Sequence, residues 1–164
     1  MDIKIIPVEE KDKQILANLL ELYEYDFSEF SNLDLNEDGR YGYKYLNNYW
    51  QEKDRHPFFI KVGGKLAGFV LINKHTYLSN SANAIAEFFI LKKYRRGGIG
   101  QTVARQIFDM FPGKWEVTQT NQNREAQIFW RKVISEYTGG DYQEVILDND
   151  KWKGPVQTFD NSKA

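Results

Sequence analysis

The stretch from Ala86 to Phe111, AEFFILKKYRRGGIGQTVARQIFDMF, constrains the fold more than any other part of the chain. It begins with a short apolar run from Glu87 to Leu91, which is rich in aromatic and β-branched residues and predicts a largely buried strand. It ends with an apolar side chain at every fourth position, and this spacing predicts an amphipathic helix. The helical positions are Ile99, Val103, Ile107 and Phe111. A strand, a turn and a helix are therefore expected in succession.

The turn between the predicted strand and helix is basic and rich in glycine. Its cations are Lys92, Lys93, Arg95 and Arg96, and its glycines are Gly97, Gly98 and Gly100. A helix start presents unpaired backbone N–H groups and a partial positive charge, and glycines let a ligand approach those groups closely. The turn is therefore expected to bind an anion such as a phosphate or pyrophosphate. A helix start with incidental basic residues is the alternative that these residues alone leave open.

Two common nucleotide-binding motifs do not fit this turn. A Walker loop needs a Lys–Ser or Lys–Thr pair after the glycines, and none follows. The dinucleotide fingerprint needs a third glycine where this chain has Val103. The anion is therefore not assigned to either motif.

Length, charge and cysteine content exclude several classes of protein. With 164 residues the chain can form a core without disulfides or metals, and we expect residues 1–164 to be a single domain. The net charge of −1 argues against nucleic-acid binding driven by overall charge. The chain has no cysteine, which excludes a disulfide scaffold, a thiolate zinc site and a cysteine nucleophile. No signal peptide or long apolar run is recognisable, so we expect a cytoplasmic protein that binds no membrane.

The other segments predict strands and helices around the opening stretch. Strands are expected at Ile3–Val8, Phe58–Val62, Leu66–Ile72, Trp115–Thr120, Tyr142–Leu147 and Val156–Phe159, and helices after Asp12, over Tyr41–Glu52 and from Asn123. Gly63 and Gly64 predict a tight hairpin turn. This order predicts an α/β fold of the α+β type, with a mixed, mostly antiparallel central sheet of about seven strands flanked by about four helices. The one strand–helix–strand unit predicts a single parallel pairing.

The segment from Gln14 to Gly39 has no Lys or Arg and is acidic throughout. Its carboxylates belong to Glu21, Glu24, Asp26, Glu29, Asp34, Glu37 and Asp38. One interpretation is a solvated surface, and the other is a rim that attracts a cationic substrate.

Within the segment, DLNEDG matches the first half of a calcium-binding loop. Tyr45 stands where a bidentate carboxylate should close that loop, which argues against calcium.

Taken together, FFILKKYRRGGIG, the amphipathic helix, the next strand and NREAQIFW resemble the GNAT superfamily of N-acetyltransferases. The family's turn pattern is Arg or Gln, two free positions, Gly, one free position, then Gly or Ala, and Arg95, Gly98 and Gly100 fill it. The resemblance is clear over residues 84–133. The spacing of the helix that flanks the family's cofactor is matched by Asn123, Ala126 and Phe129.

The resemblance implies acetyl coenzyme A as the acetyl donor and no metal. The backbone amides of Arg96–Gln101 would hold the pyrophosphate, and the pantetheine arm would pair with the backbone of Phe89–Leu91, where the family's fourth strand splays from its fifth. A backbone N–H near Ile90 would polarise the thioester carbonyl. The implied cofactor-binding residues are Phe89, Ile90, Leu91, Arg95, Arg96, Gly97, Gly98, Ile99, Gly100, Gln101, Asn123, Phe129 and Trp130.

Acetyl transfer to an amine needs a neutral nucleophile and a proton for the departing thiolate. Glu87 is the candidate catalytic base, acting directly or through water, and Ile90 is a catalytic candidate through its N–H. A glutamate that binds the substrate amine or faces solvent is the alternative. Trp130 stands where the family usually has a tyrosine that protonates the thiolate, and an indole is not a useful acid. Trp130 could instead be a core residue, and Tyr137, two turns along the same helix, is expected to lie too far away to replace it.

The leading prediction is an N-acetyltransferase that transfers an acetyl group from acetyl coenzyme A to a primary amine of a small cationic molecule or peptide, by direct attack in a ternary complex. A similar strand in spermidine and spermine acetyltransferases favours a polyamine-like acceptor. Trp130 favours the alternative of a non-catalytic acyl coenzyme A binding or sensing module, and a structural domain is a third class. No nucleic acid or membrane partner is expected. The protein would be a monomer or a homodimer, with the final strand available to pair with a second chain.

Overall fold

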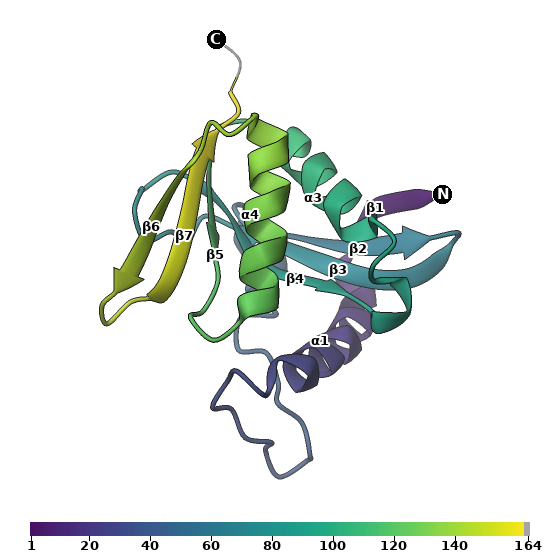
Figure 1. Cartoon of the computed structure of the whole chain (residues 1–164). Helices are drawn as coiled ribbons and strands as arrows, with labels where there is room; N and C mark the ends of the chain where they lie inside the picture. Colours follow the sequence, from purple (N-terminus) through teal and green to yellow (C-terminus); the bar gives the residue numbers. More distant parts are fainter. Residues whose placement is uncertain (163–164) are drawn as a thin grey trace. The chain divides into compact units, whose positions relative to one another are not determined.

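The computed structural model describes residues 1–162, and its strands lie in one sheet in the order β1-β2-β3-β4-β5-β7-β6 (Figure 1). The strands are β1 (Ile3–Pro7), β2 (His56–Val62), β3 (Lys65–Asn73), β4 (Asn83–Ile90), β5 (Lys114–Thr118), β6 (Gln143–Asp148) and β7 (Lys153–Asp160). The helices are α1 (Lys13–Phe27), α2 (Asn48–Gln51), α3 (Ile99–Met110) and α4 (Arg124–Thr138), with 3₁₀ turns η1 (Glu10–Asp12) and η2 (Lys92–Tyr94). The predicted fold class, a mixed and mostly antiparallel sheet of seven strands with four helices, is confirmed over the described residues.

The chain divides into two compact units. The first comprises Met1–Leu71 with Glu87–Tyr94, and the second comprises Ile72–Ala86 with Arg95–Ala164. Because two of the divisions fall within β3 and β4, these strands contribute residues to both units. The prediction that residues 1–164 form a single domain stays a prediction.

In the first unit, β1 pairs antiparallel with β2, with Ile5 opposite Ile60. β2 begins at His56, two residues earlier than expected. The predicted hairpin turn between β2 and β3 is present, since Gly63 and Gly64 have φ angles of 57° and 80°. The apolar runs and the glycine pair therefore located β2, β3 and the turn between them correctly.

The packing of the first unit depends on one helix face and one close backbone approach. α1 buries Leu16, Leu19 and Leu20, the helical spacing that its sequence shows. β3 and β4 approach so closely at Gly68 that an added Cβ atom would lie 1.9 Å from the carbonyl oxygen of Phe89. Only glycine permits this approach.

The helix expected over Tyr41–Glu52 is wrong for most of its length, because only α2 (Asn48–Gln51) is helical. Gly42 has a φ angle of 72°, in the left-handed region that does not continue a right-handed helix. The N–H groups of Tyr41 and Gly42 donate to the carboxylate of Glu21 on α1, each at 2.8 Å. These bonds to Glu21 hold the start of the segment as a turn, and the helix forms only from Asn48.

In the second unit, β4 and β5 are parallel, with Asn83 opposite Trp115 and Ala84 opposite Glu116. This is the single parallel pairing that the strand–helix–strand order predicted. α3 ends with Phe111 as its C-cap residue, immediately before Pro112 and Gly113, as expected. The buried face of α3 consists of Ile99, Val103, Ala104, Ile107 and Phe108.

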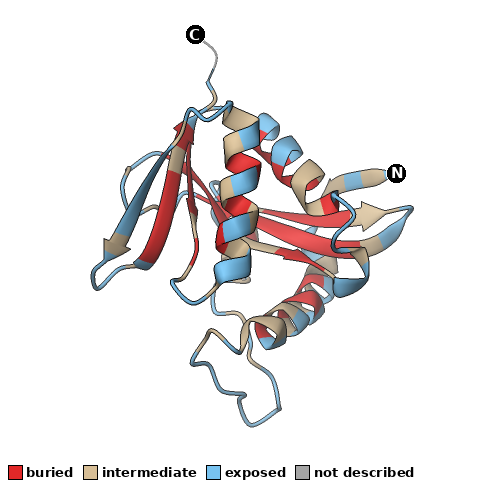
Figure 2. Ribbon diagram, in the orientation of Figure 1, coloured by how far each residue is buried: buried red, intermediate tan, exposed pale blue. Residues whose placement is uncertain are grey.

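The C-terminal strand is paired on both sides. β7 is antiparallel to β5, with Phe159 opposite Trp115, and to β6, with Val156 opposite Val145. Figure 2 shows the contrast between largely buried β7 and largely exposed β6. The final strand is therefore not an edge of the described sheet, whose edge strands are β1 and β6.

Candidate functional site

A cluster of one carboxylate and three tyrosines surrounds Glu87 on β4 in the first unit. The hydroxyl of Tyr23 on α1 donates to Oε1 of Glu87 at 3.0 Å. The side chain of Tyr43, in the loop between α1 and α2, also reaches the Glu87 carboxylate and lowers its pKa by hydrogen bonding, and the charge of Glu87 acts on Tyr49 as well. We call Glu87, Tyr23, Tyr43 and Tyr49 the Glu87 cluster.

Glu87 is partly buried, and its environment favours the protonated carboxyl. Burial raises the pKa of Glu87 to about 7, and the negative charge of Glu24 adds to the rise. Hydrogen bonds from Tyr23 and Tyr43 oppose it, because they stabilise the carboxylate. A carboxyl that titrates near neutral pH can accept and release a proton under physiological conditions.

The three tyrosines of the cluster remain neutral at the same pH. Burial is the largest cause of a raised pKa at Tyr23, Tyr43 and Tyr49, and the charge of Glu87 raises each further. For Tyr49 the pKa is about 12. Within the Glu87 cluster, the carboxyl is therefore the group whose charge changes near pH 7.

Aromatic rings and one arginine enclose the cluster. The ring of Tyr23 packs edge-on against Phe69 and Phe89, with centroids 5.5 and 5.6 Å away. The guanidinium of Arg55, buried at 7% exposure, lies 5.4 Å from the ring centre of Tyr49. Sequence reasoning identified Glu87 but missed these tyrosines. Their one signal was position: Tyr23 stands between Glu21 and Glu24, and Tyr43 and Tyr49 lie in the tyrosine-rich segment that follows Gly39.

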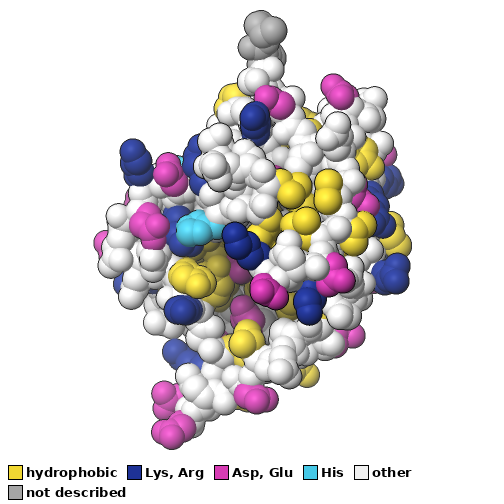
Figure 3. Space-filling view, turned by 90° about the vertical axis from the view of Figure 1, so that its left-hand side faces the viewer, with side chains coloured by type: hydrophobic (Ala, Val, Ile, Leu, Met, Phe, Trp, Pro, Cys, Tyr) yellow, Lys and Arg dark blue, Asp and Glu magenta, His cyan; other side chains and the backbone are white. Residues whose placement is uncertain are grey.

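The acidic segment separates into two parts. Glu24 is 8% exposed, and both burial and the charge of Glu21 raise its pKa. By contrast, Asp34, Glu37 and Asp38 are exposed on the loop of residues 28–47. Figure 3 shows acidic side chains gathered at the lower end of the molecule, where this loop projects in Figure 1. Asp34, Glu37 and Asp38 are therefore solvated, whereas Glu24 belongs to the surroundings of Glu87.

The calcium-like stretch within this loop is a backbone turn. Oδ1 of Asn36 accepts hydrogen bonds from the N–H groups of Asp38 and Arg40, at 2.9 and 3.1 Å. The side chain at a would-be ligand position is therefore used to hold the loop. Among residues 1–162, no group of three or more His, Asp or Glu side chains is arranged to hold a metal ion.

In the basic glycine turn, Lys92 and Lys93 belong to the first unit, and the part from Arg95 onward, which leads into α3, belongs to the second. Arg96 and Gly98 both have positive φ, 68° and 81°, and Arg95–Gly98 are exposed. Positive φ angles beside ordinary ones direct successive backbone N–H groups to one side, which is an anion-binding geometry. Gln101, one of the predicted cofactor residues, donates its side-chain amide to Glu136 of α4 at 3.0 Å. The turn is therefore shaped for an anion, and Gln101 also links α3 to α4.

The predicted pantetheine segment at the end of β4 is well packed. Phe89 and Ile90 are 6% and 8% exposed. The N–H of Leu91 donates to the carbonyl of Ala67 on β3 at 2.8 Å. The assignments of Phe89, Ile90 and Leu91 to the cofactor, and of Ile90 to catalysis, stay predictions.

The residues predicted on α4 have structural roles. Asn123 is the N-cap of α4, since its Oδ1 accepts from the N–H of Ala126 at 3.1 Å. Trp130 is 6% exposed and packs against Phe129 and Phe108, with ring centroids 5.0 and 6.3 Å away. The interpretation of Trp130 as a core residue therefore fits its packing. The roles of Asn123, Phe129 and Trp130 in cofactor binding stay predictions.

Tyr137, the other tyrosine considered as an acid, is part of a structural network. Its hydroxyl donates to Asp109 at 2.6 Å and accepts from the side-chain amide of Asn161 at 3.0 Å. Burial, followed by the bond to Asp109, raises the pKa of Tyr137. Tyr137 therefore ties α4 to α3 and to the residues after β7.

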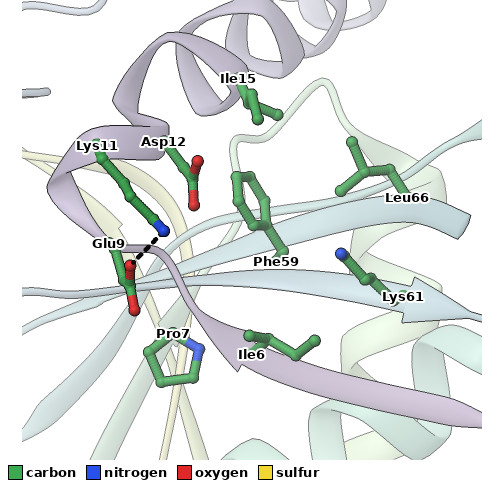
Figure 4. A pocket seen from close by; sticks show the side chains of 9 residues that line it. All are labelled: Ile6, Pro7, Glu9, Lys11, Asp12, Ile15, Phe59, Lys61 and Leu66. Carbon is green, nitrogen blue, oxygen red and sulfur yellow. Dashed lines mark ion pairs between the residues drawn. The ribbon is translucent and has the colours of Figure 1, made fainter. Parts of the chain in front are cut away.

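A cavity of about 340 Å³ lies elsewhere in the first unit (Figure 4). It is lined by residues of β1, η1, α1, β2 and β3, and the ring of Phe59 lies between Asp12 and Lys61. The Lys11–Glu9 ion pair at its rim, 3.4 Å long, is exposed at both ends. No member of the Glu87 cluster lines this cavity, so it is separate from the candidate site.

Comparisons with solved structures identify the fold. The chain is similar to an acetyltransferase from Thermus thermophilus, at a TM-score of 0.72 and 12% identity, covering 98% of this chain and 97% of that chain. It is similar to the spermidine N-acetyltransferase from Vibrio cholerae in complex with CoA and spermine, at a TM-score of 0.66 and 13% identity, covering 97% of this chain and 95% of that chain. It is also similar to the ribosomal-protein-S18-alanine N-acetyltransferase from Escherichia coli, at a TM-score of 0.62 and 11% identity, covering 99% of this chain and 96% of that chain. These likenesses define the class as the acetyltransferase fold.

The chain belongs to the Acetyltransferase (GNAT) family, whose model matches residues 19–134. The predicted resemblance and the acetyltransferase class are thereby confirmed. A comparison with curated protein sequences found no match. In the described part of the chain, no helix has the length and apolar character required to span a membrane.

Proposed function

We propose that this protein transfers the acetyl group of acetyl coenzyme A to a primary amine of a small cationic molecule or peptide. The observation that carries the proposal is Glu87, whose carboxyl titrates near pH 7 among three neutral tyrosines. Amines are protonated at this pH, and a base that accepts their proton must itself be poised near it. A buried carboxyl with this pKa fits that task.

The surroundings of Glu87 favour a cationic acceptor. Glu24 contributes a second, nearly buried carboxyl, whose negative charge acts on Glu87 and favours a nearby cation. Because spermidine and ribosomal-protein acetyltransferases share the fold, a polyamine and a peptide amine both belong in the first substrate panel. The negative charge near Glu87 suits both of these cationic amines.

For the donor, we assign the pyrophosphate of coenzyme A to the turn of residues 95–101. The backbone conformation at Arg96 and Gly98 supports this assignment, because it exposes N–H groups beside several cations. Acetyl coenzyme A would supply the acetyl group as a thioester, which the amine nitrogen attacks in a ternary complex.

The contribution of this chain to the reaction is proton transfer and orientation. Glu87 accepts the proton of the substrate ammonium, directly or through water, which leaves the neutral nitrogen that forms the new C–N bond. The C–S bond breaks, and the proton lost by the attacking nitrogen neutralises the departing thiolate. The hydroxyls of Tyr23 and Tyr43 hold the Glu87 carboxylate in place. No acid at Trp130 is required in this scheme.

The test is thiol release from acetyl coenzyme A with spermidine, a lysine-containing peptide and a peptide with a free α-amine. We expect at least one amine to give turnover above background hydrolysis, and Glu87→Gln to reduce that turnover by about 100-fold or more. Glu29→Gln, which removes the same charge at an exposed position, is the matched control. Binding of coenzyme A without turnover for any amine would instead support a non-catalytic acyl coenzyme A module.

A further inference from the structure

The loop of residues 28–47 brings Tyr43 to Glu87 with little regular structure of its own. Long loops without secondary structure in compact units usually serve a function. In this loop, Tyr43 is the residue that interacts with the Glu87 carboxylate and lowers its pKa. The segment just before Tyr43 must therefore be held against a rigid element if that contact is to persist.

Glu21 on α1 supplies this attachment. Its Oε1 accepts from the N–H of Tyr41 at 2.8 Å, and its Oε2 accepts from the N–H of Gly42 at 2.8 Å. Both bonds are charge-assisted and stronger than bonds between neutral groups. The neighbouring residues Leu19 and Leu20 are buried, at 7% and 1% exposure, so the helix that carries Glu21 is firmly packed.

The backbone at the attachment is suited to this geometry. Gly42 adopts a φ angle of 72°, which places consecutive N–H groups on one carboxylate and turns the chain toward Tyr43. Each oxygen of Glu21 already accepts one backbone N–H. Glu21 therefore acts on the loop and, unlike Glu24, is not a cause of the altered pKa of Glu87.

We propose that Glu21 is a positioning residue of the acceptor site: its carboxylate fixes the backbone of Tyr41 and Gly42 and thereby holds the Tyr43 hydroxyl on Glu87. The proposal deepens the function proposed above and rests on it for its catalytic consequence. Loss of the bonds between Glu21 and the backbone of Tyr41 and Gly42 leaves Glu87 in place but lets Tyr43 move away. Acceptor binding and proton transfer should therefore weaken, whereas coenzyme A affinity should not change.

The attachment itself is tested without any turnover, by hydrogen exchange of the Tyr41 and Gly42 amides followed by NMR. In Glu21→Gln, an amide group replaces one acceptor oxygen, and we expect both N–H groups to exchange at least about tenfold faster. Glu29→Gln, an equal change of charge at an exposed position, should leave both rates unchanged. Unchanged exchange in Glu21→Gln would overturn the proposal.

The route through Tyr43 is tested by a double-mutant cycle of Glu21→Gln and Tyr43→Phe. We expect each single variant to reduce kcat/KM for the amine about tenfold without changing coenzyme A affinity, and the double variant to be no worse than Tyr43→Phe alone. If the loss of kcat/KM in the double variant equals the product of the two single losses, Glu21 acts independently of Tyr43, and the proposal is overturned.

The same cycle can be read without catalysis, which separates this proposal from the proposed function. If no amine is acetylated, the NMR titration of the Glu87 carboxyl carbon replaces kcat/KM. We then expect Glu21→Gln to shift that titration in the presence of Tyr43 and not in the Tyr43→Phe background. A shift of equal size in both backgrounds, or in neither, would overturn the positioning role.

Discussion

At the scale of single residues, the decisive feature is the environment of Glu87. Burial raises its pKa to about 7, although two tyrosines donate hydrogen bonds that lower it. A base in this role must be deprotonated, so kcat/KM for the amine should rise with pH and level off above about 7. A pH profile of Glu87→Gln should lack this limb while coenzyme A affinity stays unchanged. Equal loss of affinity and turnover would argue against a base.

The same pKa predicts an unusual dependence of stability on pH. Between the ordinary value of 4.5 and about 7, the folded protein keeps a proton on Glu87 that the unfolded chain has lost. The free energy of unfolding therefore falls as pH rises through this window. Relative to Glu87→Gln, the free energy of unfolding of the wild type should fall by on the order of 3 kcal/mol between pH 4.5 and 8, at about 1.36 kcal/mol per pKa unit. Urea unfolding of both proteins at each pH measures this change. A difference in free energy of unfolding between the two proteins that stays constant with pH would contradict the prediction.

A second residue-scale prediction concerns the anion site at Gly98. Its φ angle of 81° is tolerated by both Asn and Asp, so Gly98→Asn and Gly98→Asp differ mainly by one negative charge. Beside a pyrophosphate, that charge should cost about 1 to 2 kcal/mol, which weakens coenzyme A binding roughly 5- to 30-fold relative to Gly98→Asn. Calorimetric titration measures both affinities. Equal dissociation constants for the two variants would show that the turn does not bind the pyrophosphate of coenzyme A.

At the scale of secondary-structure elements, the closest approach of two strands is at Gly68. A Cβ atom there would lie 1.9 Å from the carbonyl oxygen of Phe89, so β3 and β4 would have to separate. Gly68→Ala should therefore lower the free energy of unfolding by about 3 kcal/mol. Gly97→Ala, where no atom lies within 4 Å of the new Cβ, is the control and should change it by less than about 0.5 kcal/mol. A tolerated Gly68→Ala would contradict the observed strand contact.

At the scale of the whole molecule, membership of the GNAT family predicts that the donor stabilises the fold. A ligand present at 100 times its dissociation constant raises the free energy of unfolding by about 2.7 kcal/mol. For a chain of this length, the melting temperature should rise by about 5 to 10 °C. Thermal unfolding with and without acetyl coenzyme A measures the shift, and Gly98→Asp should show a smaller one. No shift would favour a structural domain.

Much of the fold could be predicted because its signals are local. The glycine pair Gly63–Gly64, the N-cap Asn123 and the four-residue spacing that begins at Ile99 each report the conformation of their own neighbourhood. The parallel pairing of β4 and β5 followed from the helix between them. The helix predicted over Tyr41–Glu52 was wrong for most of its length because Gly42 adopts a left-handed φ angle of 72°, and the N–H groups of Tyr41 and Gly42 donate to the Glu21 carboxylate, 20 residues from Tyr41 in the chain.

The sequence by itself determined the strand, basic turn and amphipathic helix around Gly98, and with them the family, because these depend on periodicity and neighbouring residues. It also identified Glu87 as the candidate base. Only the tertiary structure decided what surrounds that base: Tyr23 comes from α1 and Tyr43 from the following loop, 64 residues away in the case of Tyr23. A pKa near 7 requires burial and charges from several elements at once, and that environment exists only after the chain has folded.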